Sequence, residues 1–245
     1  MEKSVCISDV HIPYEDKRTV GTVLRFIAKF KPDIIFINGD LMDCMDISSF
    51  DKPLEKHPNL KEEIEETKYF LLKLRSIAPK ARIIYILGNH SYRLQSYIAK
   101  NARELYGLKG LTLQEQLGCE DIDVEIIDNG TKENYIRYGD LFIGHWDKSL
   151  KHSGYTAKAL LDDKGVSIIQ GHTHRLGAIY KRDLEGIKGA WECGCLCDIN
   201  PKYVNHPNWN QGFLTIHLDK KTNTSHVTVV PIIDHKIVYG DKVFR

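Results

Sequence analysis

Short apolar runs alternate with helix-like segments through the first half of the chain. Apolar residues dominate Ser4 to Ser8, Asp33 to Asn38 and Arg82 to Leu87, and these runs have the length of buried strands. Between them, Lys17 to Phe30 carries apolar residues at helical spacing, and Asn59 to Ala78 is acidic at its start and basic near its end, as a helix dipole favours. This β-α-β-α-β alternation predicts a mostly parallel sheet.

The second half is richer in strand patterns. Tyr135 to Tyr138 and Leu141 to Gly144 flank a Gly-Asp turn signal, and a short helix from Thr156 to Asp162 precedes a strand from Ser167 to Gln170. Four more strands are predicted, at Ala178 to Arg182, Gly189 to Cys195, Gly212 to His217 and His226 to Ile233. We expect these four to form a second, more antiparallel sheet packed on the first. The predicted fold class is α/β, a four-layer α/β/β/α sandwich of two mixed sheets with flanking helices.

Composition narrows the class of protein. No repeat or linker divides the 245 residues, so we expect a single domain over residues 1–245. The formal charge of +1, from 34 Lys+Arg against 33 Asp+Glu, excludes a generally basic nucleic-acid coat but not a local basic surface. The sequence shows no long apolar run, no signal-peptide pattern and no dense disulfide framework. We therefore expect a cytoplasmic protein with reduced thiols and no membrane partner.

Three cysteines stand out because they alternate along the chain. Cys193, Cys195 and Cys197 have the period of a strand, which would direct all three thiols to one face of a sheet. Packing as small apolar side chains is the favoured interpretation. A thiolate metal site is the alternative, although zinc sites usually separate their cysteines more widely.

A polar or metal-binding residue follows each of five apolar strands. The five motifs are Asp9-Val10-His11, Gly39-Asp40, Gly88-Asn89-His90, Gly144-His145 and Gly171-His172-Thr173-His174. Ligands of open α/β sheets bind beyond the carboxyl ends of the strands, so we expect the five motifs to meet at one edge. Carboxylate, imidazole and amide oxygen together form the mixed ligand set that suits Mn, Fe, Zn or Ni.

The motifs contain more candidate ligands than one tetrahedral site can use. The seven candidates are Asp9, His11, Asp40, Asn89, His145, His172 and His174. Seven ligands suffice for two ions that share a bridge, and Asp40 is the natural bridge because a carboxylate has two oxygens. Two ions about 3.5–4 Å apart would clamp a phosphoryl oxygen and acidify a bridging water for in-line attack.

In this order the motifs resemble the signature of the calcineurin-like metallophosphoesterase superfamily, from about Ser4 to His174. The resemblance implies a metal-dependent phosphoric ester hydrolase with two divalent ions, Mn²⁺ first and Fe, Zn or Ni as alternatives. It also implies two ligand sets, Asp9, His11, Asp40 and His174 for the first metal, and Asp40, Asn89, His145 and His172 for the second.

The resemblance also implies two catalytic residues beside the ligands. His90 would bind the phosphate and protonate the leaving oxygen, which suits an imidazole because its pKa lies near operating pH. Asp43 stands where related protein phosphatases carry an aspartate that steadies this histidine. Ser91 is a departure, because the family usually has an acidic residue there. We expect Ser91→Glu to leave metal content unchanged and to preserve or raise turnover.

Residues next to the motifs indicate the substrate. Tyr92, Arg93, Trp146 and Lys148 add aromatic and basic side chains beside the predicted site, and Trp146 to Lys158 holds three lysines against one aspartate. This combination suits a phosphodiester with bases to stack on, although a solvated surface would carry the same lysines. A further aromatic stretch that includes Tyr203, His206 and Trp209 lies either at the rim of the site or in an ordinary packed loop.

Three functions are therefore open. We expect a phosphodiesterase or nuclease-like enzyme that acts on nucleotides or DNA by attack of a metal-bridging hydroxide. The second possibility is a phosphomonoesterase that acts on a small molecule or phosphoprotein. The third is a non-catalytic binding scaffold, a role that the phosphoesterase-like subunit of retromer fills with a degraded site. Retention of every candidate ligand and of His90 counts against the scaffold.

Overall fold

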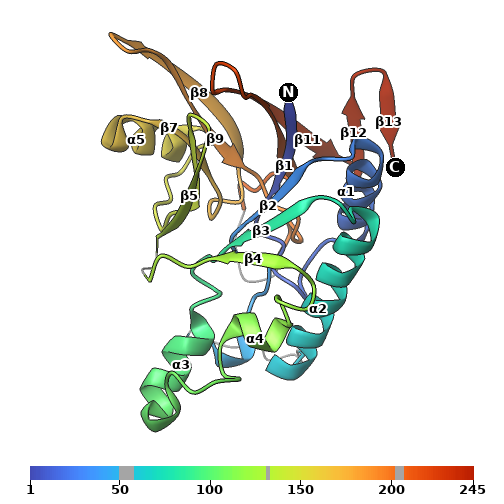
Figure 1. Cartoon of the computed structure of the whole chain (residues 1–245), viewed down its shortest axis with the longest axis vertical. Helices are drawn as coiled ribbons and strands as arrows, with labels where there is room; N and C mark the ends of the chain where they lie inside the picture. The colour runs from blue at the N-terminus through green and yellow to red at the C-terminus, as the bar shows by residue number, and fades with distance from the viewer. Residues whose placement is uncertain (50–57, 131–132, 202–206) are drawn as a thin grey trace.

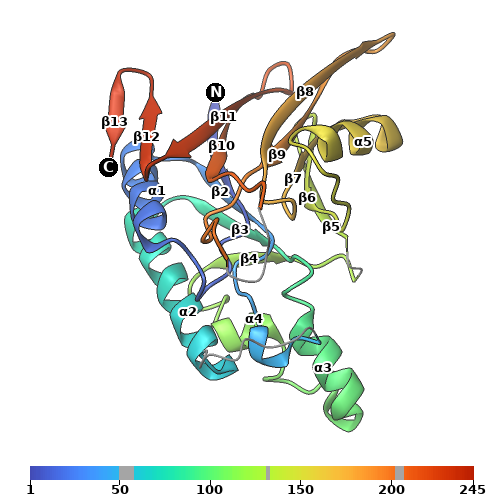
Figure 2. The same cartoon turned by 180° about the vertical axis from the view of Figure 1, so that it is seen from behind.

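Two β-sheets pack face to face in the computed structural model, which describes residues 1–49, 58–130, 133–201 and 207–245 (Figure 1). The larger sheet has the strand order β13-β12-β11-β10-β1-β2-β3-β4, and the smaller has the order β5-β6-β7-β9-β8. Helices cover the outer faces of both sheets (Figure 2). The predicted α/β/β/α sandwich of two mixed sheets is confirmed.

The larger sheet is parallel at one end and antiparallel at the other. Its strands are β1 (Glu2–Ile7), β2 (Ile34–Asn38), β3 (Arg82–Ile86), β4 (Val124–Ile127), β10 (Gly212–Asp219), β11 (Thr224–Ile233), β12 (Lys236–Tyr239) and β13 (Lys242–Phe244). Strands β1 to β4 are parallel, whereas β10 runs antiparallel to β1 in the register Glu2↔Leu218 to Cys6↔Leu214. The prediction that the strands near 212–217 and 226–233 belong to the second sheet is therefore wrong. They extend the first sheet because β10 pairs with the edge of β1 that β2 leaves open.

The smaller sheet carries the second half of the predicted site. Its strands are β5 (Asn134–Tyr138), β6 (Leu141–His145), β7 (Ser167–Gln170), β8 (Leu176–Asp183) and β9 (Gly186–Cys193). Strands β6, β7 and β9 are parallel, and β5 and β8 pair antiparallel at the two edges. Because β6 and β7 are parallel, the loops that follow them emerge at the same edge of the sheet.

Buried side chains fill three layers between these elements. Alternate residues of β1 point to opposite faces, so Val5 and Ile7 pack under helices while Cys6 faces the second sheet. The layer between the sheets joins Phe36 and Leu214 of the larger sheet to Ile143, Ile169 and Trp191 of the smaller.

The helices are amphipathic segments that cover these layers. They are α1 (Lys17–Phe30), α2 (Leu60–Ile77), α3 (Arg93–Asn101), α4 (Leu113–Leu117) and α5 (Tyr155–Lys164), with single 3-10 turns at Met45–Ile47 and Arg103–Leu105. Helix α1 packs on the larger sheet and α5 on the smaller. Helix α5 starts after Gly154, which has no side chain to cap it. The buried Glu192 carboxylate accepts hydrogen bonds from the backbone N–H groups of Gly154, Thr156 and Ala157 instead.

The three alternating cysteines do not share one strand, which corrects the prediction of thiols on one face. Strand β9 ends at Cys193, and Gly194 has a left-handed φ of 79° that redirects the chain. Cys193 points between the sheets and donates to the Cys6 carbonyl oxygen at 3.1 Å. Cys195 and Cys197 are also buried, but they lie near His174 instead.

Candidate metal centre

The predicted ligands lie at the carboxyl ends of strands from both sheets, either on the loops that follow or, for His145, at the last residue of β6. Several of them have a backbone φ in the left-handed region that residues with side chains rarely adopt. These residues are Asp9 (52°), His11 (53°), Asp40 (42°), His172 (71°) and His174 (56°). Such strain persists only where surrounding contacts hold it, and it clusters at functional sites. Here the backbone N–H of His11 donates to the Asp40 carbonyl oxygen at 2.9 Å, which ties two of the loops together.

One group of ligands consists of Asp9, His11 and His174. Their ligand atoms lie within 4.8 Å of one another. His174 Nε2 is 3.2 Å from Asp9 Oδ1 and 3.0 Å from His11 Nε2. The Asp9 carboxylate is fully buried and also accepts the backbone N–H of His172. Two imidazole nitrogens and a carboxylate oxygen therefore converge on one point.

A second group consists of Asp40, His145 and His172, whose ligand atoms also lie within 4.8 Å of one another. His145 Nδ1 donates to the Asn38 carbonyl oxygen at 2.8 Å, so its Nε2 faces Asp40 Oδ2 at 3.1 Å. Asn89 joins this group because its Oδ1 is 2.9 Å from His172 Nδ1.

Asp40 lies between the two groups. Its Oδ2 atom is 3.1 Å from His145 Nε2 in one group and 4.0 Å from His11 Nε2 in the other. The same oxygen is 3.8 Å from His90 Nε2, and His11, Asp40 and His90 form a third close set. This placement would let one carboxylate contact ions in both groups.

Two glycines allow the loops to approach this closely. A Cβ atom on Gly39 would lie 2.0 Å from His145 Nδ1, and a Cβ atom on Gly88 would lie 2.2 Å from Asp40 Oδ1. Both distances are far below van der Waals contact. The glycines that precede Asp40 and Asn89 in the motifs are therefore required by packing of the ligands themselves.

The buried charges strongly perturb one another. Burial disfavours the ionised form of Asp9, but the imidazoles of His174, His11 and His145 together outweigh burial and lower the pKa of Asp9. The pKa of Asp40 is lowered well below its usual value for the same reason, mainly by His145. In return, burial would lower the pKa values of His145 and His174, yet these carboxylates raise both to about 9. The cluster thus attracts positive charge.

Three observations indicate that divalent metal ions fit this cluster. His11 Nε2 and His174 Nε2 face each other at 3.0 Å, an arrangement that a shared cation would satisfy. The buried His145 Nε2 makes no hydrogen bond despite its short distance to Asp40. The donor set is nitrogen and oxygen, which suits first-row transition metals.

Asp43 supports two histidines. Its Oδ2 atom is 2.9 Å from His11 Nδ1 and 3.5 Å from His90 Nδ1, while the Asp43 backbone oxygen accepts from His90 Nδ1 at 2.9 Å. Burial opposes ionisation of Asp43, but the hydrogen bonds and charges of His11 and His90 together outweigh it and lower the pKa of Asp43. A carboxylate behind a metal-ligating histidine fixes the ring orientation and the tautomer. The sequence pointed to the contact with His90 and not to the closer one with His11.

Arg93 contacts both of these residues. Its Nη1 donates to the backbone oxygen of Asp43 at 2.8 Å and to Oδ1 at 3.1 Å, and its Nη2 donates to His90 Nε2 at 3.0 Å. Arg93 therefore lies beside the metal cluster.

The other three residues predicted to contact substrate have different surroundings. Trp146 is 1% exposed and packs in the core beneath α5, so the structure counts against its role as a substrate contact. Tyr92 is partly buried and its hydroxyl donates to Asp128. Lys148 is exposed on the loop after His145. Tyr203 and His206 lie outside the described residues.

Ser91 lies outside the ligand groups. It is 2% exposed, and its hydroxyl is 2.8 Å from the hydroxyl of the fully buried Tyr85. A glutamate here would bring an uncompensated carboxylate into the core, which costs free energy. The structure therefore counts against the expectation that Ser91→Glu preserves turnover.

Two residues near the centre were not assigned to it from the sequence. The Trp209 ring lies 4.2 Å from the His174 ring between centroids, and the Cys197 Sγ atom lies 3.6 Å from His174 Nδ1. The aromatic stretch that contains Trp209 was a weak signal. The alternation of the cysteines was another, but it suggested a shared strand.

The chain belongs to the calcineurin-like phosphoesterase family, because the model of that family matches residues 3–176. The matched segment contains both ligand groups, Asp43 and His90. The chain is thus a metallophosphoesterase by family, with a buried His/Asp cluster suited to metal ions.

Individual relatives extend over the full length. The chain is 27% identical to the gene 54 protein of Mycobacterium phage L5 over 262 residues, covering 100% of this chain and 99% of that protein. It is also 27% identical to the gene 54 protein of Mycobacterium phage D29, over 95% and 94% of the two chains.

Solved structures are similar at lower identity. A single mutant of Vps29 from Entamoeba histolytica has a TM-score of 0.48 with 13% identity, over 96% of each chain. The phosphoesterase Yfce from E. coli has a TM-score of 0.43 with 14% identity, over 97% of each chain.

No helix among the described residues is both long enough and apolar enough to span a membrane.

Proposed function

We propose that this metallophosphoesterase is a two-metal phosphodiesterase that acts on nucleotides or DNA. The observation that carries the proposal is the pairing of Arg93 with Asp43 beside His90. Because Asp43 offsets the charge of Arg93, this pair adds little net positive charge to the site. A phosphomonoester dianion carries two negative charges and would need more positive charge than the pair supplies. A diester carries one negative charge, which bound divalent ions would neutralise.

We propose two sets of metal ligands from the grouping of the side chains. One ion would be held by Asp9, His11, Asp40 and His174, and the other by Asp40, Asn89, His145 and His172. Divalent ions bound there would polarise a phosphoryl oxygen and supply hydroxide near neutral pH. We propose Mn²⁺ as the first ion to test, with Fe, Zn and Ni as alternatives, because a mixed nitrogen and oxygen set accepts all four.

His90 and Arg93 would exchange partners during the reaction. With Nδ1 donating to the Asp43 carbonyl oxygen, His90 Nε2 accepts a hydrogen bond from Arg93. Uptake of a proton from solvent at Nε2 ends this contact, since two donors cannot share one hydrogen bond. The Arg93 Nη2 group can then bind a phosphate oxygen, while the imidazolium gives its proton to the leaving alkoxide. The Asp43 carboxylate lies 3.5 Å from His90 Nδ1 and helps to orient the ring.

Hydrolysis of bis-p-nitrophenyl phosphate and p-nitrophenyl phosphate by Mn²⁺-loaded protein tests the proposal. We expect a higher kcat/KM for the diester. Preference for the monoester would support the phosphomonoesterase instead, and inactivity without bound metal would favour a binding scaffold. A screen of single-stranded DNA, duplex DNA and cyclic nucleotides then identifies the substrate, with Lys148→Ala testing the exposed lysine beside the site.

His90→Ala tests the proton transfer separately. The variant should keep both metals and lose most turnover with poor leaving groups, because only a poor leaving group needs protonation in the transition state. Equal losses for good and poor leaving groups would contradict a general-acid role for His90.

A further inference from the structure

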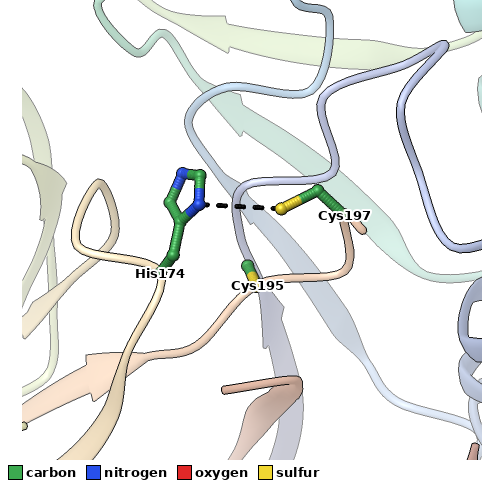
Figure 3. Close-up of side chains that lie close together, drawn as sticks. All are labelled: His174, Cys195 and Cys197. Atoms are coloured by element: carbon green, nitrogen blue, oxygen red, sulfur yellow. Dashed lines mark hydrogen bonds between the residues drawn. The ribbon is translucent and has the colours of Figure 1, made fainter. Parts of the chain in front are cut away.

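One nitrogen of the His174 ring faces the sulfur atom of Cys197, and Cys195 lies close by (Figure 3). His174 Nδ1 lies 3.6 Å from Cys197 Sγ, and Cys195 completes a set whose three ligand atoms lie within 4.8 Å of one another. The cysteines are almost fully buried, with Cys195 0% and Cys197 3% exposed. A nitrogen and two sulfur atoms thus converge beside the predicted metal centre.

Backbone hydrogen bonds hold this set in place. The N–H of Cys195 donates to the Asn210 carbonyl oxygen at 3.1 Å, and the N–H of Leu196 donates to the Asp9 carbonyl oxygen at 3.0 Å. The N–H of Asn210 in turn donates to the His174 carbonyl oxygen at 2.8 Å. The cysteine segment and the histidine loop are therefore connected by their main chains, and the three side chains need no large movement to share a ligand.

The partner of His174 differs in kind from those of the other candidate ligands. His11 Nδ1 faces a carboxylate oxygen of Asp43, and His145 Nδ1 faces the carbonyl oxygen of Asn38. Oxygen partners of this kind orient a ligating imidazole but do not compete for a soft metal. A thiol does compete, because thiolate sulfur binds Zn²⁺ and other thiophilic ions strongly.

We propose that Cys195, Cys197 and Nδ1 of His174 form a binding site for a thiophilic divalent ion such as Zn²⁺ or Cd²⁺. In a tetrahedral zinc site with Zn–S near 2.3 Å and Zn–N near 2.0 Å, neighbouring nitrogen and sulfur ligands lie about 3.5 Å apart. The 3.6 Å between His174 Nδ1 and Cys197 Sγ matches this separation. Water would complete the coordination, as in other zinc sites with three protein ligands. Binding releases to solvent the two thiol protons and, from the imidazolium form of His174, the proton on Nδ1.

Occupation of this site would withdraw His174 from the dinuclear centre, a consequence that rests on the proposed function. A neutral imidazole carries one proton, so an ion on Nδ1 leaves the proton on Nε2. A protonated Nε2 cannot ligate a metal, and it would instead donate to Asp9 Oδ1, which lies 3.2 Å away. A thiophilic ion bound by the two cysteines and His174 would thereby weaken metal binding by Asp9, His11 and Asp40, which would lose His174 as their fourth ligand.

Titration of reduced, metal-free protein with Cd²⁺ tests the site itself. We expect a thiolate-to-metal charge-transfer band in the wild type that is absent from the Cys195→Ala/Cys197→Ala variant. Cys119→Ala is the matched control, because Cys119 is equally buried but belongs to the core cluster beneath the helices. The control should keep the band. Cys195→Ser/Cys197→Ser serves if the alanine variant fails to fold. No band in the wild type, or a band that survives in the folded double variant, would overturn the proposal.

Mn²⁺ binding measured by electron paramagnetic resonance tests the consequence without relying on activity. Bound Cd²⁺ should weaken the affinity for Mn²⁺ at least about tenfold in the wild type. Loss of a residue that merely orients a metal ligand already weakens metal affinity about tenfold or more, and loss of the ligand itself should weaken it further. The double variant should show no such antagonism. A charge-transfer band in protein that lacks phosphoesterase activity would support the thiolate site while rejecting the proposed function. Unchanged Mn²⁺ affinity with Cd²⁺ bound would overturn the antagonism.

Discussion

Asp43→Asn would test whether a side chain outside the ligand set controls the metal centre. The carboxylate of Asp43 is 5% exposed, accepts from His11 Nδ1 at 2.9 Å and contacts Arg93 Nη1 at 3.1 Å. Asparagine has nearly the same size but no charge. One of its two terminal groups is an amide NH₂, which would face either the His11 or the Arg93 donor.

The expected effect follows from the contact with His11. Loss of a partner that orients a metal-ligating histidine typically weakens metal affinity about 10–100-fold, or about 1.4–2.8 kcal/mol. We expect the upper part of this range, because the variant not only removes a short charged contact but also creates a buried donor facing a donor. Turnover should fall as well, since the same carboxylate lies 3.5 Å from His90 Nδ1.

Isothermal titration calorimetry with Mn²⁺ provides the measurement. Asp162→Asn is the control, because Asp162 is an exposed carboxylate that pairs with Lys158 and Lys181 on the surface. Its replacement should leave Mn²⁺ affinity within about twofold of the wild type, as expected for a surface ion pair. A folded Asp43→Asn protein that also stays within this range would refute the assignment of Asp43 as the support of His11.

Three further predictions concern protonation, packing and stability. The nearby carboxylates, against the opposing effect of burial, raise the pKa values of His145 and His174 to about 9. Mn²⁺ must displace these protons, so the affinity for Mn²⁺ should rise with pH, by up to about tenfold per pH unit for each proton displaced, and level off above pH 9. A Kd for Mn²⁺ that does not change with pH would contradict this. The folding stability of the metal-free protein should change with pH in the opposite direction. The raised pKa values stabilise the fold below pH 6.5, and this contribution to stability is lost as pH rises through 9. Gly88→Ala should abolish measurable Mn²⁺ binding, because its Cβ would lie 2.2 Å from Asp40 Oδ1; retained affinity would show that the loop adjusts. Glu192→Ala should lower the free energy of unfolding by about 2–4 kcal/mol in denaturant titrations, since three N–H groups of α5 lose their acceptor, with Glu192→Gln losing less. Equal stability of the alanine variant would rule out this capping role.

The sequence predicted the sandwich because hydrophobic periodicity indicates where helices and strands form, and the order of these elements along the chain indicates how they are layered. Helix α1 spans Lys17–Phe30, as its spacing indicated, and strand β7 spans Ser167–Gln170. Elements with weaker patterns were not predicted, among them the four-residue strand β4 and the five-residue helix α4. Such short segments depend on packing against longer neighbours more than on their own periodicity.

The sequence could also predict which residues would come together at the strand ends of each sheet, because parallel strands of one sheet end at the same edge. The meeting of the motifs after β1, β2 and β3 with those after β6 and β7 depends on how the two sheets pack. It could not predict contacts within the cluster. The distance from Asp43 to His11 depends on how the loop after β2 folds back toward β1, and the burial of Trp146 depends on where α5 packs. Both depend on tertiary contacts between segments that are separated along the chain.

The order of strands shows the same division between sequence and tertiary structure. The sequence pattern of an amphipathic or fully apolar strand is the same whichever sheet the strand joins. Only the pairing of β10 with β1, and of β11 with β10, assigns these two strands to the larger sheet. The family motifs, the ligand residues and the layered fold were present in the sequence, since each depends on residue type and local spacing. The meeting of His174 with Cys195 and Cys197 was decided by the tertiary structure alone, because a left-handed turn at Gly194 and hydrogen bonds to distant loops direct those thiols.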